Sequence, residues 1–408
     1  MSEILFLAHS VPFPPNRGDK IRAYHLLRKL ASLGPVHLGC LSENAEDRGS
    51  ISEIDQVAAS HCVSNRLKPL ILAGVEAVLA GKPVSLTAFH SARLEKWVRK
   101  TIAQRPISAI VVFSGQMGQY IPEGFAGPVV VDLCDVDSAK FESYAEAGER
   151  VWLNAREARL LAMEEERLAR RADATVLISK AEAALFRSRL QAPFISDLKV
   201  IGNGIDARLF DPAAVLPHPR LDPSRGPHFV FTGQMDYRPN EAAALWAIEH
   251  FLPAIRGAHQ TARLHIVGRN PTPALRAKDG AEGLSIWGEV PDVKPFLASA
   301  TCVVAPLLIA RGVQNKVLEA MAMARPVVLT PDAAAGIDAI DGEHWIESPA
   351  DAQTMCSRIE PFLAQPDKAA ATGKSAREFV LEHHAWDAML APLSDLVRTH
   401  AGEARDAA

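Results

Sequence analysis

The sequence predicts an α/β protein made of two doubly wound domains, each built on a parallel sheet. Short, continuous apolar runs alternate with helical patterns, which is typical of parallel strands that are covered on both faces. This pattern occurs twice, and a segment with five prolines between Pro212 and Pro227 separates the two occurrences. We interpret that segment as a linker. Sheets of this kind bind ligands at the carboxyl ends of their strands.

The predicted strands follow one another in two sets. The first set comprises residues 4–9, 36–41, 109–115, 129–135, 174–179 and 199–204. The second comprises 228–233, 262–268, 284–288, 301–306 and 325–330. A helix that ends at Gly34 and a long charged helical stretch over 138–171, interrupted near Gly148, are expected between strands of the first set.

Composition narrows the class of protein. The chain has 408 residues, of which 48% are hydrophobic and 23% are charged, so it can fill two cores. The net charge of −4 argues against a polyanion-binding molecule, and we expect no nucleic-acid partner. Five scattered cysteines without CxxC spacing favour reduced thiols over a disulfide framework or a zinc site.

The termini and apolar runs indicate a cytoplasmic protein. The first residues, MSEILFLAHS, lack the basic region of a signal peptide and are predicted to form a strand. The longest apolar stretch, Leu70–Gly81, contains Glu76 and is too short to span a bilayer.

Two charges interrupt the apolar segment KVLEAMAMA, where we predict a helix over about 314–324. Asn315 is a suitable helix-start residue. A cation in the first turn, Lys316, opposes the helix dipole by about 0.3–1 kcal/mol unless an anion such as phosphate binds there. Glu319 lies one turn later on the same face and could accept hydrogen bonds from a diol. A simple Lys–Glu surface pair is the alternative.

The segment NRGDKIR follows the first strand. Gly18 would let the backbone approach a ligand, Asp19 would cap the helix, and Lys20 or Arg22 would contact the ligand. The helix from Lys20 also carries basic residues that could lie against anionic lipid, with an ordinary solvated face as the alternative. No GxGxxG motif follows this strand, which argues against a nicotinamide-dependent dehydrogenase.

Two carboxylates, Asp135 and Asp137, are expected at the carboxyl end of a strand, where one could orient an acceptor hydroxyl or take its proton. Helix capping by Asp137 or Ser138 is the alternative. His9 ends the first strand and is a further candidate on the acceptor side, although a structural role is open for a lone histidine.

Several motifs together resemble family 4 glycosyltransferases of the GT-B fold, in order over nearly the whole chain. They are ADATVLISKAEA, NGID, HIVGRN, WGEVPDVKPFLASA, EAMAMARPVV and AWDAML. VPFPPNRGDKIRAYHLLRKLA and VVVDLCDVDSAKF resemble, more narrowly, the exopolysaccharide sugar transferases associated with exosortase (PEP-CTERM) systems.

The resemblance implies two Rossmann-like domains that face a cleft. We place the N-terminal, acceptor-side domain at 1–205 and the C-terminal, nucleotide-sugar-binding domain at 206–384, with a last helix at about 385–402 packing back on the first. It also implies retaining transfer from a nucleotide-diphosphate sugar, without a cofactor or a required metal. The acceptor would be a glycan or a lipid-linked glycan, and peripheral contact with the cytoplasmic face of the inner membrane is compatible with it.

Glu319 matches the second Glu of the family's E-x7-E motif, but Arg311 stands where the first Glu would be. In the loop FTGQMDYRPN, where the family often has Arg and Lys, this chain has Gln234 and Pro239. We therefore expect Arg311, Lys316 and N–H groups near Gln314 and Asn315 to hold the diphosphate. Gly233 and Gln234 complete the predicted donor site. A nucleotide-sugar epimerase and a non-catalytic GT-B-like binding protein are the alternative functions.

Replacement of Arg311 by Ala tests the diphosphate hypothesis. We expect kcat/KM to fall severalfold, because a cation at this place would stabilise negative charge that develops on the leaving diphosphate. Steady-state kinetics measure the effect, and a decrease smaller than about threefold would contradict the hypothesis.

Overall fold

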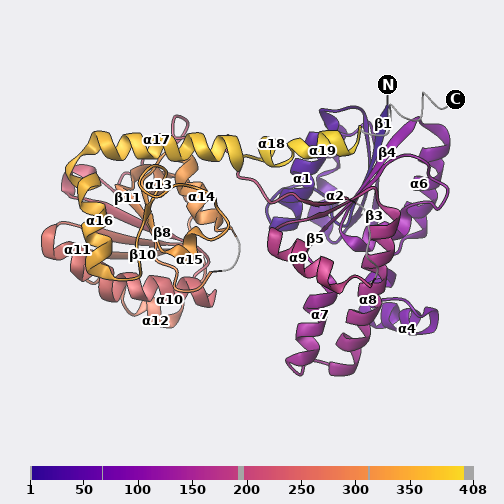
Figure 1. Cartoon of the computed structure of the whole chain (residues 1–408), viewed down its shortest axis with the longest axis horizontal. Coiled ribbons are helices and arrows are strands. Elements are labelled where there is room, and N and C mark those ends of the chain that lie inside the picture. Colours follow the sequence, from indigo (N-terminus) through magenta and orange to yellow (C-terminus); the bar gives the residue numbers. More distant parts are fainter. Residues whose placement is uncertain (1, 67, 192–196, 311–312, 399–408) are drawn as a thin grey trace. The chain divides into compact units, whose positions relative to one another are not determined.

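Two separate parallel sheets organise the protein in the computed structural model, which describes residues 2–66, 68–191, 197–310 and 313–398. The first sheet belongs to a unit that runs to Asn203 and takes in the chain again from Met389, and the second to the unit Gly204–Ala388 (Figure 1).

The sheet of the first unit has seven strands in the order β3-β2-β1-β4-β5-β6-β7, and every pairing is parallel. The strands are β1 Glu3–Ala8, β2 Val36–Ser42, β3 Ser60–Asn65, β4 Ile107–Phe113, β5 Val129–Cys134, β6 Ala174–Leu177 and β7 Asp197–Val200. Strand β3 was not predicted, because this edge strand, SHCVSN, is largely polar.

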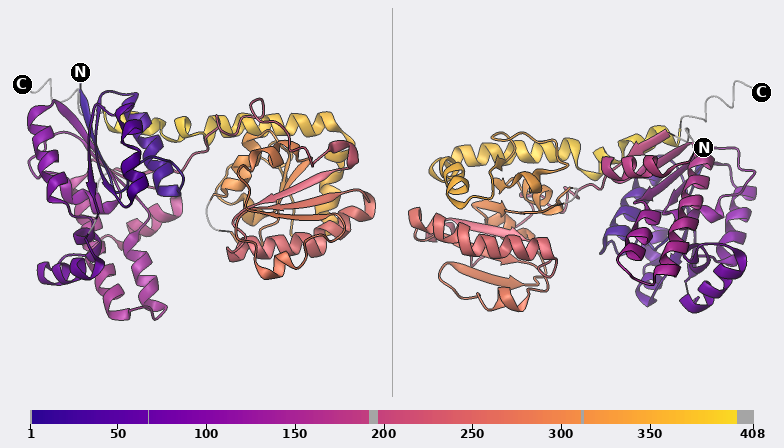
Figure 2. Two further views of the ribbon diagram at one scale, coloured as in Figure 1. Left: turned by 180° about the vertical axis from the view of Figure 1, so that it is seen from behind. Right: turned by 60° about the horizontal axis from the view of Figure 1, so that its bottom comes forward.

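Helices surround this sheet. They are α1 Gly18–Ala31, α2 Ala45–Gly49, α3 Ile51–Asp55, α4 Leu70–Ala80, α5 Val84–Ala88, α6 Ala92–Gln104, the 3-10 helix η1 Gly115–Tyr120, α7 Asp137–Glu146, α8 Val151–Arg171, α9 Lys180–Arg189 and, near the C-terminus, α19 Ala391–Leu396. Helix α18, Trp386–Met389, spans the boundary between the two units at Ala388. The predicted break near Gly148 separates α7 from α8, which form a hairpin that extends from the sheet (Figure 2).

The second sheet has six parallel strands in the order β10-β9-β8-β11-β12-β13. They are β8 His228–Thr232, β9 Arg263–Val267, β10 Leu284–Gly288, β11 Cys302–Ala305, β12 Val327–Leu329 and β13 Ile346–Glu347. The two-residue strand β13 was not predicted. The α/β class with two doubly wound parallel sheets is confirmed.

The helices of the second unit cover both sides of its sheet (Figure 1). They are η2 Pro223–Arg225, α10 Arg238–Trp246, the π-helical turn η3 Ala247–Phe251, α11 Leu252–Ala258, α12 Pro273–Arg276, α13 Lys294–Ser299, α14 Asn315–Ala322, α15 Pro331–Ala334, α16 Ala352–Ala364 and α17 Pro366–His383. Among the helices of the described residues, none combines the length and the apolar composition that a bilayer-spanning segment needs.

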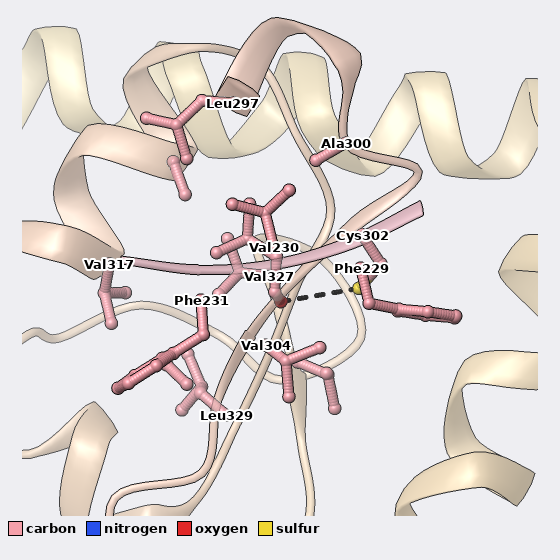
Figure 3. Close-up of a cluster of buried hydrophobic side chains, with 14 of the residues drawn as sticks. Phe229, Val230, Phe231, Leu297, Ala300, Cys302, Val304, Val317, Val327 and Leu329 are labelled. Atoms are coloured by element: carbon pink, nitrogen blue, oxygen red, sulfur yellow. Dashed lines mark hydrogen bonds between the residues drawn. The ribbon is translucent and has the colours of Figure 1, made fainter. Parts of the chain in front are cut away.

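The apolar face of α14 fixes that helix against the second sheet. Val317 lies fully buried in a cluster with Phe231 of β8 and Leu329 of β12 (Figure 3). Leu318 and Met321 on the same helix are also fully buried. The rotation of α14 about its axis is therefore set by packing, which in turn sets the direction of its two charged side chains.

The proline-rich segment is not a free linker, which corrects the sequence-based prediction. Leu221 is 1% exposed, and the His218 ring stacks on Phe296 with ring centroids 4.2 Å apart. Ile205 forms a backbone bridge with Ala385. The prolines end secondary structure here, but the apolar residues between them pack on the second unit.

A buried ion pair anchors α1 to the first sheet. Nη2 of Arg22 lies 2.7 Å from Oδ2 of Asp132 on β5, and the guanidinium also donates to the carbonyls of Ile201 and Gly202 and to Oδ1 of Asn203. Although burial opposes it, the charge of Asp132 raises the pKa of Arg22. Arg22 thus joins α1, the middle of the sheet and the segment after β7.

Loss of this guanidinium should destabilise the first unit. We expect Arg22→Met to lower the free energy of unfolding by about 3–5 kcal/mol, because it leaves the Asp132 carboxylate buried without its partner. Urea unfolding followed by circular dichroism measures the change. Arg28→Met, at an exposed position on the same helix, is the control and should change stability by about 0.5 kcal/mol or less. Equal stability of the two variants would contradict this role of Arg22.

A close backbone contact between two loops of the second sheet has a similar consequence. A Cβ on Gly268 would overlap the carbonyl oxygen of Gly233. We expect Gly268→Ala to cost about 1–3 kcal/mol or more, because backbone must move. Gly257→Ala on α11 is the control, since its Cβ would meet nothing within 4 Å, and should be neutral or slightly stabilising. Thermal unfolding that ranks the two variants alike would refute the prediction.

Candidate functional site

A pocket of about 470 Å³ lies at the carboxyl ends of the strands in the second unit. The strand order reverses between β8 and β11, and ligands of doubly wound sheets bind at such a reversal. Six of the predicted residues line this pocket: Gly233, Gln234, Gln314, Asn315, Lys316 and Glu319. Gly18, which was also predicted to bind the donor, instead lines a pocket of the first unit. Gln314 occupies the N-cap position of α14, so Asn315 is the first helical residue and not the cap.

Lys316 is held inside this pocket. Its ammonium donates a hydrogen bond to Oδ1 of Asn240 and lies 5.1 Å from the ring centroid of Phe231. Burial lowers the pKa of Lys316 to about 8, and the charge of Glu319 opposes the shift. A cation with so little water around it is poised to gain from a bound anion.

Glu319 lies one helical turn from Lys316 and lines the same pocket. Burial raises the pKa of Glu319 to about 7, against the opposing charge of Lys316. The two charges therefore do not form the exposed surface pair that was the alternative. Each has an ionisation equilibrium near neutral pH, as is common among ligand-binding groups.

Arg311 lies outside the described residues, and its role stays a prediction. Arg269 is a further charged residue of this pocket that was not predicted from the sequence. Nη2 of Arg269 donates to Oε1 of Gln234 at 2.7 Å, and Arg269 lines the pocket. The signal that could have found it is its place directly after β9, in the motif HIVGRN.

A second pocket, of about 400 Å³, lies in the first unit at the carboxyl ends of β1, β4 and β5. This is again the reversal of strand order, here between β1 and β4. Five of the predicted residues line it: His9, Gly18, Arg22, Asp135 and Asp137.

His9 and Asp19 form a pair in this pocket. Nε2 of His9 is 3.3 Å from Oδ2 of Asp19, and Nε of Arg17 is 2.9 Å from Oδ1 of the same carboxylate. Although burial opposes it, the hydrogen bond with His9 and the charges of His9 and Arg17 lower the pKa of Asp19. Asp19 lies in the first turn of α1 while Arg17 is the N-cap, so the expected capping role of Asp19 is wrong.

The two other carboxylates of this pocket follow β5. Nε2 of Gln116 donates to Oδ2 of Asp137 at 2.9 Å. Partial burial and the charges of Glu182 and Asp137 raise the pKa of Asp135. Ser114 and Cys134, which also line the pocket, have left-handed φ angles of 79° and 65°. Such backbone strain in non-glycine residues concentrates at functional sites.

The structure corrects the expectation for Lys20. Its ammonium lies 2.6 Å from Oδ1 of Asp47, and both side chains are buried away from the pocket. In this ion pair, as in that of Arg22, a carboxylate of the protein itself neutralises the cation. The predicted lipid-facing side of α1 is thereby reduced, because Arg22 points into the unit and is 1% exposed. Neither partner could be found from local sequence, since Asp47 and Asp132 lie far along the chain.

Comparison with known proteins agrees with this geometry. Residues 226–365, which contain the whole lining of the second unit's pocket, match the family model Glycosyl transferases group 1. No curated protein sequence matches the chain.

Solved structures extend the similarity to the whole chain. A glycosyltransferase from Rickettsia africae is 13% identical with a TM-score of 0.61, covering 98% of this chain and 99% of that chain. Sucrose-phosphate synthase from Thermosynechococcus elongatus is 16% identical with a TM-score of 0.60, covering 99% and 100%. HepE of Anabaena in complex with UDP is 14% identical with a TM-score of 0.60, covering 98% and 100%. The protein has the two-domain GT-B fold of these glycosyltransferases.

Proposed function

We propose that the protein is a glycosyltransferase that moves a sugar, with retention of configuration, from a nucleotide-diphosphate sugar to a glycan or lipid-linked acceptor. The observation that carries the proposal is the pairing of Lys316 and Glu319 in one pocket, within the segment that matches group 1 glycosyl transferases. A partly desolvated cation beside a carboxylate suits a ligand with a diphosphate next to a ribose diol.

Each donor-side group then has a role. Lys316 and Arg269 would neutralise the diphosphate, and Glu319 would accept hydrogen bonds from the ribose hydroxyls. As the bond between the anomeric carbon and the diphosphate oxygen breaks, negative charge grows on the leaving group. Cations fixed beside it stabilise that charge more in the transition state than in the ground state.

The pocket of the first unit would receive the acceptor. His9, Asp135 and Asp137 are the groups there that could orient the attacking hydroxyl and take its proton as the new glycosidic bond forms. His9 is held by Asp19 and Asp137 by Gln116, so both would meet the acceptor in a fixed orientation.

We further propose a place in exopolysaccharide biosynthesis, in the cytoplasm with peripheral contact to the inner membrane, and no cofactor or required metal. The motifs VPFPPNRGDKIRAYHLLRKLA and VVVDLCDVDSAKF support this assignment. HepE of Anabaena has been solved with UDP and with UDP-glucose, which makes uridine diphosphate sugars the first donors to test.

Incubation of the pure protein with a panel of UDP- and GDP-sugars tests the activity. A transferase should release free nucleotide slowly without an acceptor and rapidly with one, and proton NMR of the product should show the retained anomeric configuration. An altered sugar without nucleotide release would indicate an epimerase. If the sugar is unaltered and no nucleotide is released, the protein is a binding protein without turnover.

Nucleotide affinity should depend on pH through these two partly buried charges. Glu319 takes up a proton as the pH falls through about 7, and Lys316 loses one as the pH rises through about 8. Since the proposed contacts need the carboxylate and the ammonium, UDP or GDP should bind most tightly between these values. Isothermal titration calorimetry across the pH range measures this dependence.

Variants separate the two limbs of that profile. Glu319→Gln should remove the acidic limb, and Lys316→Ala should remove the alkaline limb and weaken binding about tenfold or more. Lys374→Ala, at a side chain that is 78% exposed on α17, is the control and should bind like the unaltered protein. A pH-independent affinity, or equal effects of the two lysine substitutions, would rule out the proposed contacts.

A further inference from the structure

Helix α4 packs with its small residues inward and its large apolar residues outward. Ala73 and Ala77 are fully buried, one turn apart. The large aliphatic side chains of the helix are half exposed or more: Leu70 74%, Ile71 84%, Leu72 50%, Val75 54%, Val78 52% and Leu79 83%. Surface helices ordinarily place the apolar stripe against the core, so this arrangement is the reverse of the usual one.

Polar contacts hold α4 in this orientation. Arg156 of α8 donates to the carbonyl oxygens of Ala77 and Lys82, at the C-terminal end of the helix. The Thr87 hydroxyl donates to the carbonyl of Ala73 at 2.9 Å. The carboxylate of Glu157 accepts from the N–H groups of Val84 and Ser85, which start α5. These hydrogen bonds fix the orientation of α4, so its large apolar side chains are held on the outside of the folded protein.

The surroundings of α4 continue the apolar surface. Trp152 of α8 is 70% exposed and lies one turn before Arg156, on the face of α8 that holds α4. Figures 1 and 2 show α4 at the margin of the unit beside α8. An exposed cluster of this kind marks a contact with another apolar phase or protein.

Basic groups accompany this surface. Lys68 precedes α4 and Lys82 follows it, and with His90 they line an open pocket of about 450 Å³ along the helix. Lys68 is 2.6 Å from Glu76, so that carboxylate of α4 is already neutralised. Lys82 is exposed. Lys82 therefore supplies positive charge beside the apolar side chains, and Trp152 adds an exposed aromatic ring.

We propose that α4 and Trp152 form a membrane-docking surface that lies in the interfacial layer of a bilayer rich in anionic phospholipid. The aliphatic side chains would enter the acyl boundary, Trp152 would sit at headgroup level, and Lys82 would meet the phosphates. This distribution fits a bilayer interface, which offers an apolar layer beside negative charge. The surface is on α4 and not on α1, where the sequence had suggested lipid contact.

The membrane-docking surface would bring the enzyme to a lipid-linked acceptor, and this role rests on the proposed function. Binding of the surface to a bilayer does not depend on that function. Vesicle binding and nucleotide binding are measured separately. A protein that binds vesicles but no nucleotide would leave the docking surface intact and refute the proposed transfer, and the converse result would do the opposite.

Flotation of the full chain with vesicles tests the inference. We expect binding to vesicles of equal parts phosphatidylcholine and phosphatidylglycerol, and a loss of at least about tenfold in vesicle affinity for the double variant Ile71→Glu, Leu79→Glu. Both side chains are largely exposed, so the fold should tolerate the change. Lys82→Glu should weaken binding to the mixed vesicles and leave binding to pure phosphatidylcholine vesicles unchanged.

The matched control is Leu216→Glu, at a side chain that is also 84% exposed but lies in the second unit. It should float like the unaltered protein. Absence of flotation, or equal losses in the control and the double variant, would overturn the inference. Analytical ultracentrifugation of the same proteins provides the other decisive result: a dimer that the double variant dissociates would identify a second copy as the occupant and also overturn it.

Discussion

The buried pair of Arg22 and Asp132 is the constraint on which the first unit depends. A guanidinium and a carboxylate at the centre of an apolar sheet are tolerated only when every hydrogen-bonding group is satisfied. Here the Arg22 guanidinium donates to the Asp132 carboxylate on β5 and to the backbone carbonyls of Ile201 and Gly202 after β7. The same contact fixes the start of α1, and therefore the position of Gly18 and Asp19 beside the pocket. An electrostatic requirement of folding thus determines where the chain can present a site.

The second unit reaches a comparable result by a different route. The apolar residues of α14 determine how the helix lies on the sheet, and its two charged residues are carried into the pocket as a consequence. Their desolvation shifts both ionisation equilibria toward neutrality from opposite sides. A site assembled in this way has charges that are incompletely compensated by the protein, and a ligand that complements both recovers that free energy.

The sequence was informative where chemistry is local. Continuous apolar runs identified both parallel sheets, and the two charges in KVLEAMAMA pointed to the part of α14 that lines the pocket. It was uninformative where partners are distant in sequence. Nothing near Lys20 or Arg22 in the sequence indicates that they form ion pairs with Asp47 and Asp132. Nothing near Gln234 indicates that Arg269 donates a hydrogen bond to it. Composition also misled: five prolines suggested a free linker where Leu221 and His218 pack on the second unit, and an apolar run did not reveal that α4 turns its large side chains outward.

The contact between Gly233 and Gly268 has a consequence for how such a site can diversify. Because the two backbones touch, there is no room for a side chain at Gly268, and this part of the pocket lining cannot be reshaped by substitution. Under the proposed function, discrimination between donors would then come from lining positions that carry side chains, among them Tyr237, Glu289, Val290 and Val293. Attempts to alter which ligand this pocket accepts should begin at those four positions and leave the two glycines untouched.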